Sequence, residues 1–252
     1  LADTTARRLL ATLTQLQRDG GVAHLCLTGG RIATAMYARL GELLADSEVD
    51  SSRLELWWGD ERFLPTEDPE RNAGPALALL ARYFQVDPAR THPMPSADGV
   101  VDAGASANTY AKELGETRFD ICLLGMGPDG HVASIFPNHP SSEPTTQPVI
   151  GVSDAPKPPS ERISLTLATL SRSRQVWFLV SGEEKGDSLA RALAGDPELP
   201  AAHVEGTDCT LWLIDEDEGA VVWPEDPEEL AGLVVAGGWA PGYLDSLAPR
   251  RD

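Results

Sequence analysis

The sequence predicts an α/β protein with a mainly parallel, doubly wound sheet. Short apolar runs alternate along the chain with segments whose apolar residues have helical spacing, which is the order expected of βαβ units. The runs are almost continuously apolar, as in strands buried on both faces of a parallel sheet. With 42% hydrophobic and 23% charged residues, the 252-residue chain has an ordinary globular composition. We expect residues 1–252 to form one domain, with an atypical acidic tail from about residue 217 onwards.

Six apolar runs are predicted to be strands: His24–Thr28, Leu54–Trp58, Phe119–Leu124, Arg162–Thr166, Gln175–Val180 and Thr210–Ile214. Four segments rich in Ala, Leu and polar residues are predicted to be crossover helices: Ala33–Ala45, Ala73–Tyr83, Ala103–Leu114 and Lys185–Ala194. The segment Pro137–Ser160 is rich in Pro and Ser and is predicted to be a long loop. Such a loop often works at a binding site, although it can also be a poorly ordered connection.

Charge and cysteine content limit the possible partners. The formal net charge is -19 and no Lys/Arg-rich run is present, so nucleic acid is a poor candidate ligand. An anionic substrate would therefore need a local cluster of Arg or Lys. The three cysteines, Cys26, Cys122 and Cys209, lie in apolar runs without metal-site or disulfide spacing, so we expect buried reduced thiols and a cytoplasmic protein.

No run of about 18 apolar residues is present, and Leu1–Leu16 has helical spacing where a signal peptide would have an apolar core. We therefore expect neither a membrane span nor a secretion signal in these residues. The sequence does not fix the oligomeric state, and we take a monomer as the expectation.

The turn after the first predicted strand reads Leu27-Thr28-Gly29-Gly30-Arg31 and leads into a helix. Two glycines let the backbone approach a ligand closely, and the start of a helix presents free N–H groups to an anion. Phosphate binding is one interpretation, and a simple strand-to-helix connection is the other. The turn is neither a Walker loop nor a dinucleotide-binding glycine motif.

The turn after the second predicted strand carries Gly59-Asp60-Glu61-Arg62, with Arg71-Asn72 a short distance along the chain. Ligands of open parallel sheets bind beyond the carboxyl ends of the strands, so at least one of these carboxylates is expected at the ligand edge. Arg62 is a candidate phosphate ligand. A surface turn with local ion pairs would have the same composition.

The third turn, Gly125-Met126-Gly127-Pro128-Asp129-Gly130-His131, is the richest in chemistry. It ends a buried strand, and His131 stands where a helix could begin. Histidine is suited to accept a proton near neutral pH, and Asp129 could orient its ring. The N–H groups of Gly125 to Gly127 could face a developing oxyanion. A histidine of this kind is also often purely structural.

Together these segments resemble the 6-phosphogluconolactonase family. The resemblance spans most of the chain, in the same order, and is carried by Leu27-Thr28-Gly29-Gly30, Gly59-Asp60-Glu61-Arg62 with Arg71-Asn72, Gly125 to His131, Pro156-Lys157-Pro158-Pro159 before Arg162-Ile163-Ser164-Leu165, and Val180-Ser181-Gly182-Glu183-Glu184-Lys185. It implies a Rossmann-like, three-layer α/β/α fold, which the family shares with glucosamine-6-phosphate deaminases and related isomerases. The chain departs from the family pattern at Arg31-Ile32-Ala33, where small residues are usual, and at Arg71, where Ser is common.

The deaminase branch is similar but typically places an acidic residue five positions after its histidine, where this chain has Phe136. Isomerisation and deamination need acid/base groups that move protons between carbon and oxygen, so this difference favours lactone hydrolysis. An isomerase or deaminase remains one alternative. A non-catalytic sugar-phosphate sensor on the same fold is another.

The resemblance implies hydrolysis of 6-phospho-D-glucono-1,5-lactone, a step of the oxidative pentose phosphate pathway, without a metal or other cofactor. We expect His131 to act as the general base toward water, with Asp129 or Asp60 holding its imidazole; the sequence does not say which. The expected substrate-binding residues are Thr28, Gly29, Gly30, Arg62, Asn72, Gly127, Arg162 and Lys185. The only partner that we expect is the small-molecule substrate.

Overall fold

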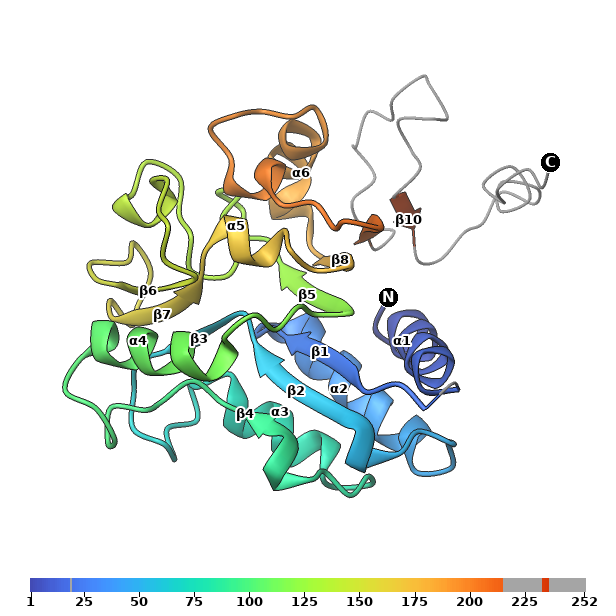
Figure 1. Cartoon of the computed structure of the whole chain (residues 1–252). Coiled ribbons are helices and arrows are strands. Elements are labelled where there is room, and N and C mark those ends of the chain that lie inside the picture. Colours follow the sequence, from blue (N-terminus) through green and yellow to red (C-terminus); the bar gives the residue numbers. More distant parts are fainter. Residues whose placement is uncertain (19, 215–232, 236–252) are drawn as a thin grey trace.

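The computed structural model describes residues 1–18, 20–214 and 233–235. Across these residues the centre is a seven-stranded sheet whose neighbouring strands all run parallel (Figure 1). In spatial order the strands are β10 (Leu233–Val235), β9 (Cys209–Ile214), β8 (Gln175–Val180), β5 (Ile121–Gly125), β1 (Ala23–Leu27), β2 (Leu54–Trp58) and β4 (Thr91–His92). The predicted α/β fold class with a mainly parallel sheet is confirmed.

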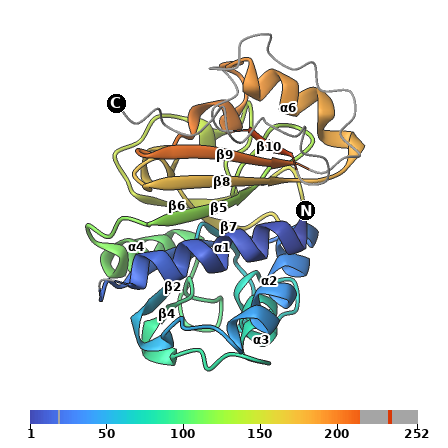
Figure 2. The same ribbon diagram turned by 90° about the vertical axis from the view of Figure 1, so that its right-hand side faces the viewer.

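Helices cover both faces of this sheet. One face packs against α1 (Ala2–Gln17), α2 (Arg31–Leu44) and α3 (Ala73–Leu80), and the other against α4 (Ala103–Leu114), α5 (Leu167–Leu170) and α6 (Gly186–Leu193). Figure 2 shows α1 and α6 on opposite sides of β8 and β9. Short 3-10 turns lie at Ser51–Arg53, Pro88–Arg90, Pro140–Ser142, Glu183–Lys185 and Pro200–His203.

The side chains of each central strand alternate between two hydrophobic cores. In β5, Ile121 and Leu123 join the core beneath α1, α2 and α3, whereas Cys122 and Leu124 join the core beneath α4 and α6. A strand with both faces buried needs apolar residues throughout, which is why β1, β2, β5, β8 and β9 read as continuous apolar runs. The chain leaves β1 for β2 on one side and later returns to β5 on the other. The carboxyl ends of β1 and β5 therefore form the switch point where ligands bind in such sheets.

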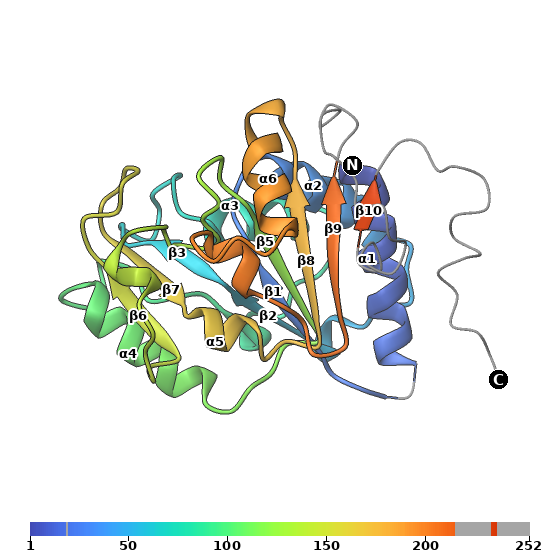
Figure 3. The ribbon, with the colours of Figure 1, turned by 90° about the horizontal axis from the view of Figure 1, so that it is seen from above.

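A second sheet of three antiparallel strands corrects one prediction. It consists of β3 (Asp60–Arg62), β7 (Arg162–Leu165) and β6 (Val149–Val152), and it lies next to α4, away from α1 (Figure 3). The run Arg162–Thr166 was expected in the parallel sheet, and that expectation is wrong. All four residues of β7 are buried, so its sequence has the character of a central parallel strand.

Two further expectations need correction. The segment Pro137–Ser160 is not wholly a loop, since it contains the 3-10 turn Pro140–Ser142 and strand β6. The cysteines carry free thiols, with Cys26 and Cys122 buried as expected, but Cys209 is only partly buried near the start of β9. The acidic tail lies outside the described residues except for β10. In the described part of the chain, no helix combines the length and apolar character that crossing a membrane requires.

Candidate active site

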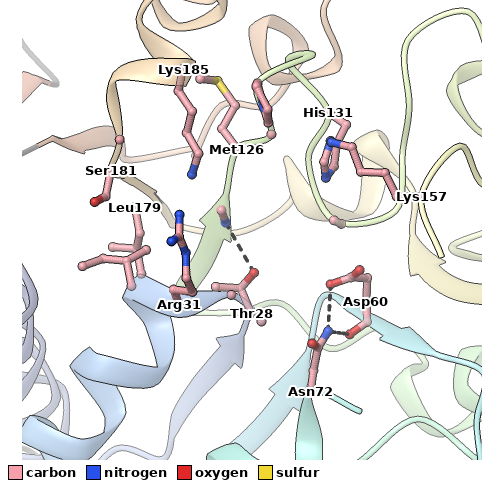
Figure 4. A pocket seen from close by; sticks show the side chains of 18 of the residues that line it. Thr28, Arg31, Asp60, Asn72, Met126, His131, Lys157, Leu179, Ser181 and Lys185 are labelled. Atoms are coloured by element: carbon pink, nitrogen blue, oxygen red, sulfur yellow. Dashed lines mark hydrogen bonds between the residues drawn. The ribbon is translucent and has the colours of Figure 1, made fainter. Parts of the chain in front are cut away.

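A pocket of about 770 Å³ opens at the carboxyl ends of β1, β5 and β8 (Figure 4). It gathers residues that are widely separated in the sequence. Of the predicted site residues, those lining it are Thr28, Gly29, Gly30, Asp60, Arg62, Asn72, Gly127, His131, Arg162 and Lys185. Asp129 does not line the pocket but contacts His131 directly.

The turn after β1 is fixed by close contacts. Tyr37 of α2 holds the backbone of Thr28 through two hydrogen bonds. Its hydroxyl accepts one from the Thr28 N–H and donates one to the Thr28 carbonyl. The Thr28 hydroxyl accepts from the Gly125 N–H at 3.3 Å and so ties β1 to β5. A Cβ atom on Gly29 would overlap the Asn72 amide, and Gly30 has a φ of +103°, so both positions need glycine.

His131 is held by a tight turn, and no helix begins there, contrary to expectation. The Gly130 N–H donates to the Gly127 carbonyl at 2.9 Å, and the Gly127 N–H donates to the His131 carbonyl at 3.0 Å. The expectation that the Gly127 N–H faces an oxyanion is therefore wrong, since that N–H already closes the turn. The N–H of Gly125 is likewise engaged by Thr28.

The imidazole of His131 is oriented by Asp129. Nδ1 of His131 lies 2.5 Å from Oδ1 of Asp129, and the Lys157 ammonium lies 3.1 Å from the same oxygen. Partial burial opposes ionisation of Asp129, but the hydrogen bonds from His131 and Lys157 outweigh it and hold the pKa of Asp129 well below its ordinary value. The carboxylate thus stays charged and is an acceptor for a proton on Nδ1, and the Lys157 ammonium lies 3.2 Å from the same ring nitrogen. A neutral ring that carries its proton on Nδ1 has Nε2 unprotonated.

Phe136 packs on the same imidazole. The two ring centroids are 4.7 Å apart, and Phe136 is fully buried. This is the position at which the deaminase branch is expected to carry an acidic residue. An apolar ring in that place cannot relay a proton, so Phe136 adds no acid/base group beside His131.

Asp60 faces the pocket but does not hold His131. Its Oδ2 accepts a hydrogen bond from the buried Ser134 hydroxyl at 2.7 Å, and its Oδ1 accepts from Asn72 Nδ2 at 3.3 Å. Of the two carboxylates considered as the partner of the imidazole, the structure places Asp129 in contact and gives Asp60 other partners. Asp60 is 6% exposed, so the pocket presents it as a fixed acceptor.

Glu61, the neighbour of Asp60, stabilises the start of α3. It is fully buried and accepts hydrogen bonds from the backbone N–H groups of Asn72 at 2.6 Å and Ala73 at 3.0 Å, at the start of α3. Arg71 approaches Glu61 at 3.5 Å. Burial raises the pKa of Glu61, against the opposing pull of Arg71 and these N–H groups. Arg71 is therefore the partner of a buried carboxylate.

Residues 1–212 match the family of glucosamine-6-phosphate isomerases/6-phosphogluconolactonase. The chain belongs to this family. It is 44% identical over 229 residues to the 6-phosphogluconolactonase of Streptomyces coelicolor, covering 85% of this chain and 88% of the relative. It is 38% identical over 234 residues to the enzyme of the same name from Mycobacterium leprae, with coverages of 88% and 94%.

The fold agrees with this assignment. The crystal structure of 6-phosphogluconolactonase from Thermotoga maritima is similar to this chain, with a TM-score of 0.76 and 26% sequence identity, over 84% of this chain and 94% of that one. These relatives place the chain on the hydrolase branch of the family.

Two arginines that line the pocket, Arg162 and Arg62, already donate hydrogen bonds to other parts of the protein. Nε and Nη2 of Arg162 donate to the carbonyls of Lys157, Pro158 and Pro159, and Nη1 donates to Ser134 at 3.5 Å. Burial lowers the pKa of Arg162, and the charge of Asp60 counteracts that shift. A guanidinium N–H of Arg62 donates to the Glu70 carbonyl.

Sequence reasoning left out three residues of the site: Lys157, Ser134 and Arg31. Lys157 lies in the Pro-Lys-Pro-Pro segment that carried part of the family resemblance, so a signal for it was present. Arg31 was visible as a departure from the usual small residues. No sequence signal pointed to Ser134, whose contact with Asp60 joins positions 74 residues apart. In the described part of the chain, no group of three or more His, Cys, Asp or Glu side chains is placed to hold a metal ion.

Proposed function

We propose that the protein hydrolyses 6-phospho-D-glucono-1,5-lactone to 6-phospho-D-gluconate, the lactonase step of the oxidative pentose phosphate pathway. The observation that carries this proposal is the 2.5 Å contact between Asp129 and Nδ1 of His131 at the wall of a pocket. An oriented imidazole beside an apolar Phe136 is suited to activating water and is poorly suited to moving protons along a sugar chain. The names of the relatives support the same reaction.

In the proposed mechanism, Nε2 of His131 removes a proton from a water molecule as the water oxygen attacks C1 of the lactone. Asp129 stabilises the imidazolium that forms. The negative charge that develops on the carbonyl oxygen is stabilised by the Lys157 ammonium, which also lines the pocket. The tetrahedral intermediate then expels the ring oxygen, and His131 returns the proton to it. The products are one hydroxyl and one carboxylic acid, which loses its proton to the solvent and becomes the carboxylate, with no covalent enzyme intermediate.

The phosphate end of the substrate is assigned to the turn after β1. Thr28, Gly29 and Gly30 lead into α2, whose first N–H groups and positive dipole end favour an anion. Lys185 lines the same pocket, and Arg62 and Arg162 add positive charge. Local positive charge is needed here because the chain as a whole carries a formal charge of -19. Asp60 and Asn72 line the same pocket, and we assign them to sugar hydroxyl groups.

Replacing Asp129 with asparagine is expected to lower kcat by about 10²-fold or more, because the amide no longer stabilises the imidazolium. KM should change little, since Asp129 lies behind His131.

The lowered pKa of Asp129 also predicts how the wild type responds to acid. The acidic side of its pH–rate profile should show no titration of Asp129 above about pH 4, because the folded pKa of this carboxyl lies below the ordinary value of about 3.9. The same shift gives a stabilising contribution that is present above that ordinary value and is lost as the pH falls through the lower folded pKa. Rate profiles and acid unfolding of both proteins measure these effects, and an unchanged kcat contradicts the assignment.

Replacing Gly127 with alanine is expected to lower kcat about tenfold or more, because the new Cβ would overlap both the His131 ring and the Asp129 carboxylate. Gly74→Ala is the matched control, since nothing lies within 4 Å of a Cβ at that exposed position in α3. The control should keep full activity and gain slight stability. If Gly127→Ala is as active as Gly74→Ala, the ring does not need the position that we describe.

A substrate panel distinguishes this proposal from its alternatives. Freshly prepared lactone in weak buffer should release protons faster with the protein than without it. Glucosamine 6-phosphate should give neither ammonia nor a ketose phosphate. Ammonia release in the absence of lactonase activity would establish a deaminase. Binding of sugar phosphates without any turnover would establish a sensor.

We also propose that the chain acts as a single domain and a monomer in the cytoplasm. The continuous seven-stranded sheet of the described residues supports one domain, and the free thiols support a reducing compartment. Light scattering coupled to gel filtration measures the mass directly. A mass near 54 kDa, twice the chain mass of 26.9 kDa, would replace the monomer with a dimer.

A further inference from the structure

Arg31 occupies the mouth of the pocket at the point where the phosphate is expected. It is the first residue of α2 and follows Gly29 and Gly30 directly. Its side chain is 94% exposed, and the residue lines the pocket. Figure 4 shows the end groups of Arg31 and Lys185 directed toward one another on one side of the pocket, while His131 lies on the other side.

The other two arginines of the pocket are more strongly engaged. Arg162 is buried and gives its Nε and Nη2 hydrogens to the loop that carries Lys157. Arg62 gives an N–H to the Glu70 carbonyl. Arg31, by contrast, approaches Glu184 at 3.8 Å, which is longer than a hydrogen bond. Among the described arginines that line this pocket, Arg31 can offer its donors to a ligand at the smallest cost in protein contacts.

We propose that Arg31 is a specificity-determining residue that binds the phosphate group of the substrate and exchanges its contact with Glu184 for that phosphate. The inference rests on the proposed lactonase function and adds to it the residue that directly follows Gly29 and Gly30. A guanidinium matches two phosphate oxygens at once, and the adjacent N-terminus of α2 favours the same anion.

Glu184 makes this exchange possible. Its carboxylate is half exposed and lies against Gly182, which lines the pocket, so its charge opposes the approach of a phosphate. A phosphate dianion attracts a guanidinium more strongly than a single carboxylate at 3.8 Å does. Arg31 thus reduces the repulsion from Glu184 and turns to the phosphate when substrate enters.

The phosphate lies at the opposite end of the substrate from the reacting carbon C1, so loss of a phosphate contact should change KM and kcat differently. The phosphate keeps its charge throughout the reaction at C1, so a phosphate ligand binds the substrate and the transition state equally. Loss of Arg31 should therefore raise KM and leave kcat nearly unchanged. For a lactone without the phosphate, loss of Arg31 should leave the kinetic constants unchanged.

The test compares 6-phosphogluconolactone with unphosphorylated glucono-1,5-lactone in wild type, Arg31→Ala, Arg31→Lys and Glu184→Gln. We expect Arg31→Ala to raise KM for the phosphorylated lactone about 10- to 100-fold and to leave kcat/KM for the other lactone unchanged. The KM of Arg31→Lys for the phosphorylated lactone should lie between those of wild type and Arg31→Ala. Glu184→Gln should lower this KM. Arg39→Ala is the control, because it removes the same charge from α2 at ion pairs with Asp3 and Glu42. Equal losses on both lactones, or an unchanged KM, overturn the proposal.

Equilibrium binding separates this inference from the function on which it rests. If the wild type hydrolyses neither lactone above background, the proposed function fails, and calorimetry with 6-phosphogluconate still tests Arg31. A dissociation constant at least tenfold weaker in Arg31→Ala than in wild type and Arg39→Ala supports the phosphate contact. Equal constants, or no binding to the wild type, overturn it.

Discussion

Replacing His131 with alanine is expected to lower kcat for the lactone by about 10²- to 10⁴-fold, the usual contribution of a positioned general base. The reason is geometric: Asp129 fixes Nδ1 and Phe136 supports the ring, so Nε2 alone is left to take the proton from water. KM should stay within a few-fold, because the phosphate and hydroxyl contacts do not involve His131. Initial rates corrected for spontaneous hydrolysis give both constants.

His203→Gln is the matched control for this prediction. His203 is exposed, and its Nε2 contacts only the Pro197 carbonyl among the contacts described for its side chain. The control should retain wild-type kinetics. A His131→Ala enzyme that is as fast as His203→Gln would leave the lactonase reaction standing but would remove His131 from it.

The second large effect is on stability. Replacing Glu61 with alanine is expected to lower the free energy of unfolding by about 3 to 5 kcal/mol, since it leaves Arg71 as an unpaired buried charge. It also removes the acceptor of the Asn72 and Ala73 N–H groups that begin α3. Urea unfolding followed by circular dichroism measures the change.

Glu61→Gln should be milder than Glu61→Ala, because burial already favours the neutral carboxyl, as the direction of its pKa shift indicates. The raised pKa means that the folded state takes up a proton before the unfolded state does. Falling pH therefore stabilises the wild type but not Glu61→Gln, so the loss of unfolding free energy caused by Glu61→Gln should grow as the pH falls toward that pKa. Glu67→Ala, at an exposed position nearby, should be neutral. A Glu61→Ala protein as stable as Glu67→Ala would contradict the structural role.

Hydrophobic periodicity revealed the fold class because the central strands are buried on both faces. It could not reveal β4, which has only two residues, or β3, whose Asp-Glu-Arg sequence has no apolar pattern. The same reasoning misplaced β7, since burial on both faces looks alike in a parallel sheet and in a small sheet covered by a helix. Only the pairing of β7 with β3 and β6 distinguishes the two cases.

The candidate site was predictable as a set of turns and unpredictable as a set of contacts. Strand ends and glycines pointed to Thr28, Asp60 and His131, because parallel strands bring their carboxyl ends together. The choice between Asp129 and Asp60 depended on the direction of side chains in a tight turn, which spacing does not encode. The approach of Lys157 to Asp129 likewise depends on β7, whose Arg162 holds the backbone of that loop.

The most direct test of the account is ¹³C NMR of freshly prepared lactone labelled at C1, mixed with a catalytic amount of the wild-type protein. The lactone carbonyl signal should convert to the 6-phosphogluconate carboxylate signal faster than in protein-free buffer, at a rate proportional to protein concentration. Conversion at the protein-free rate at every concentration would contradict the account.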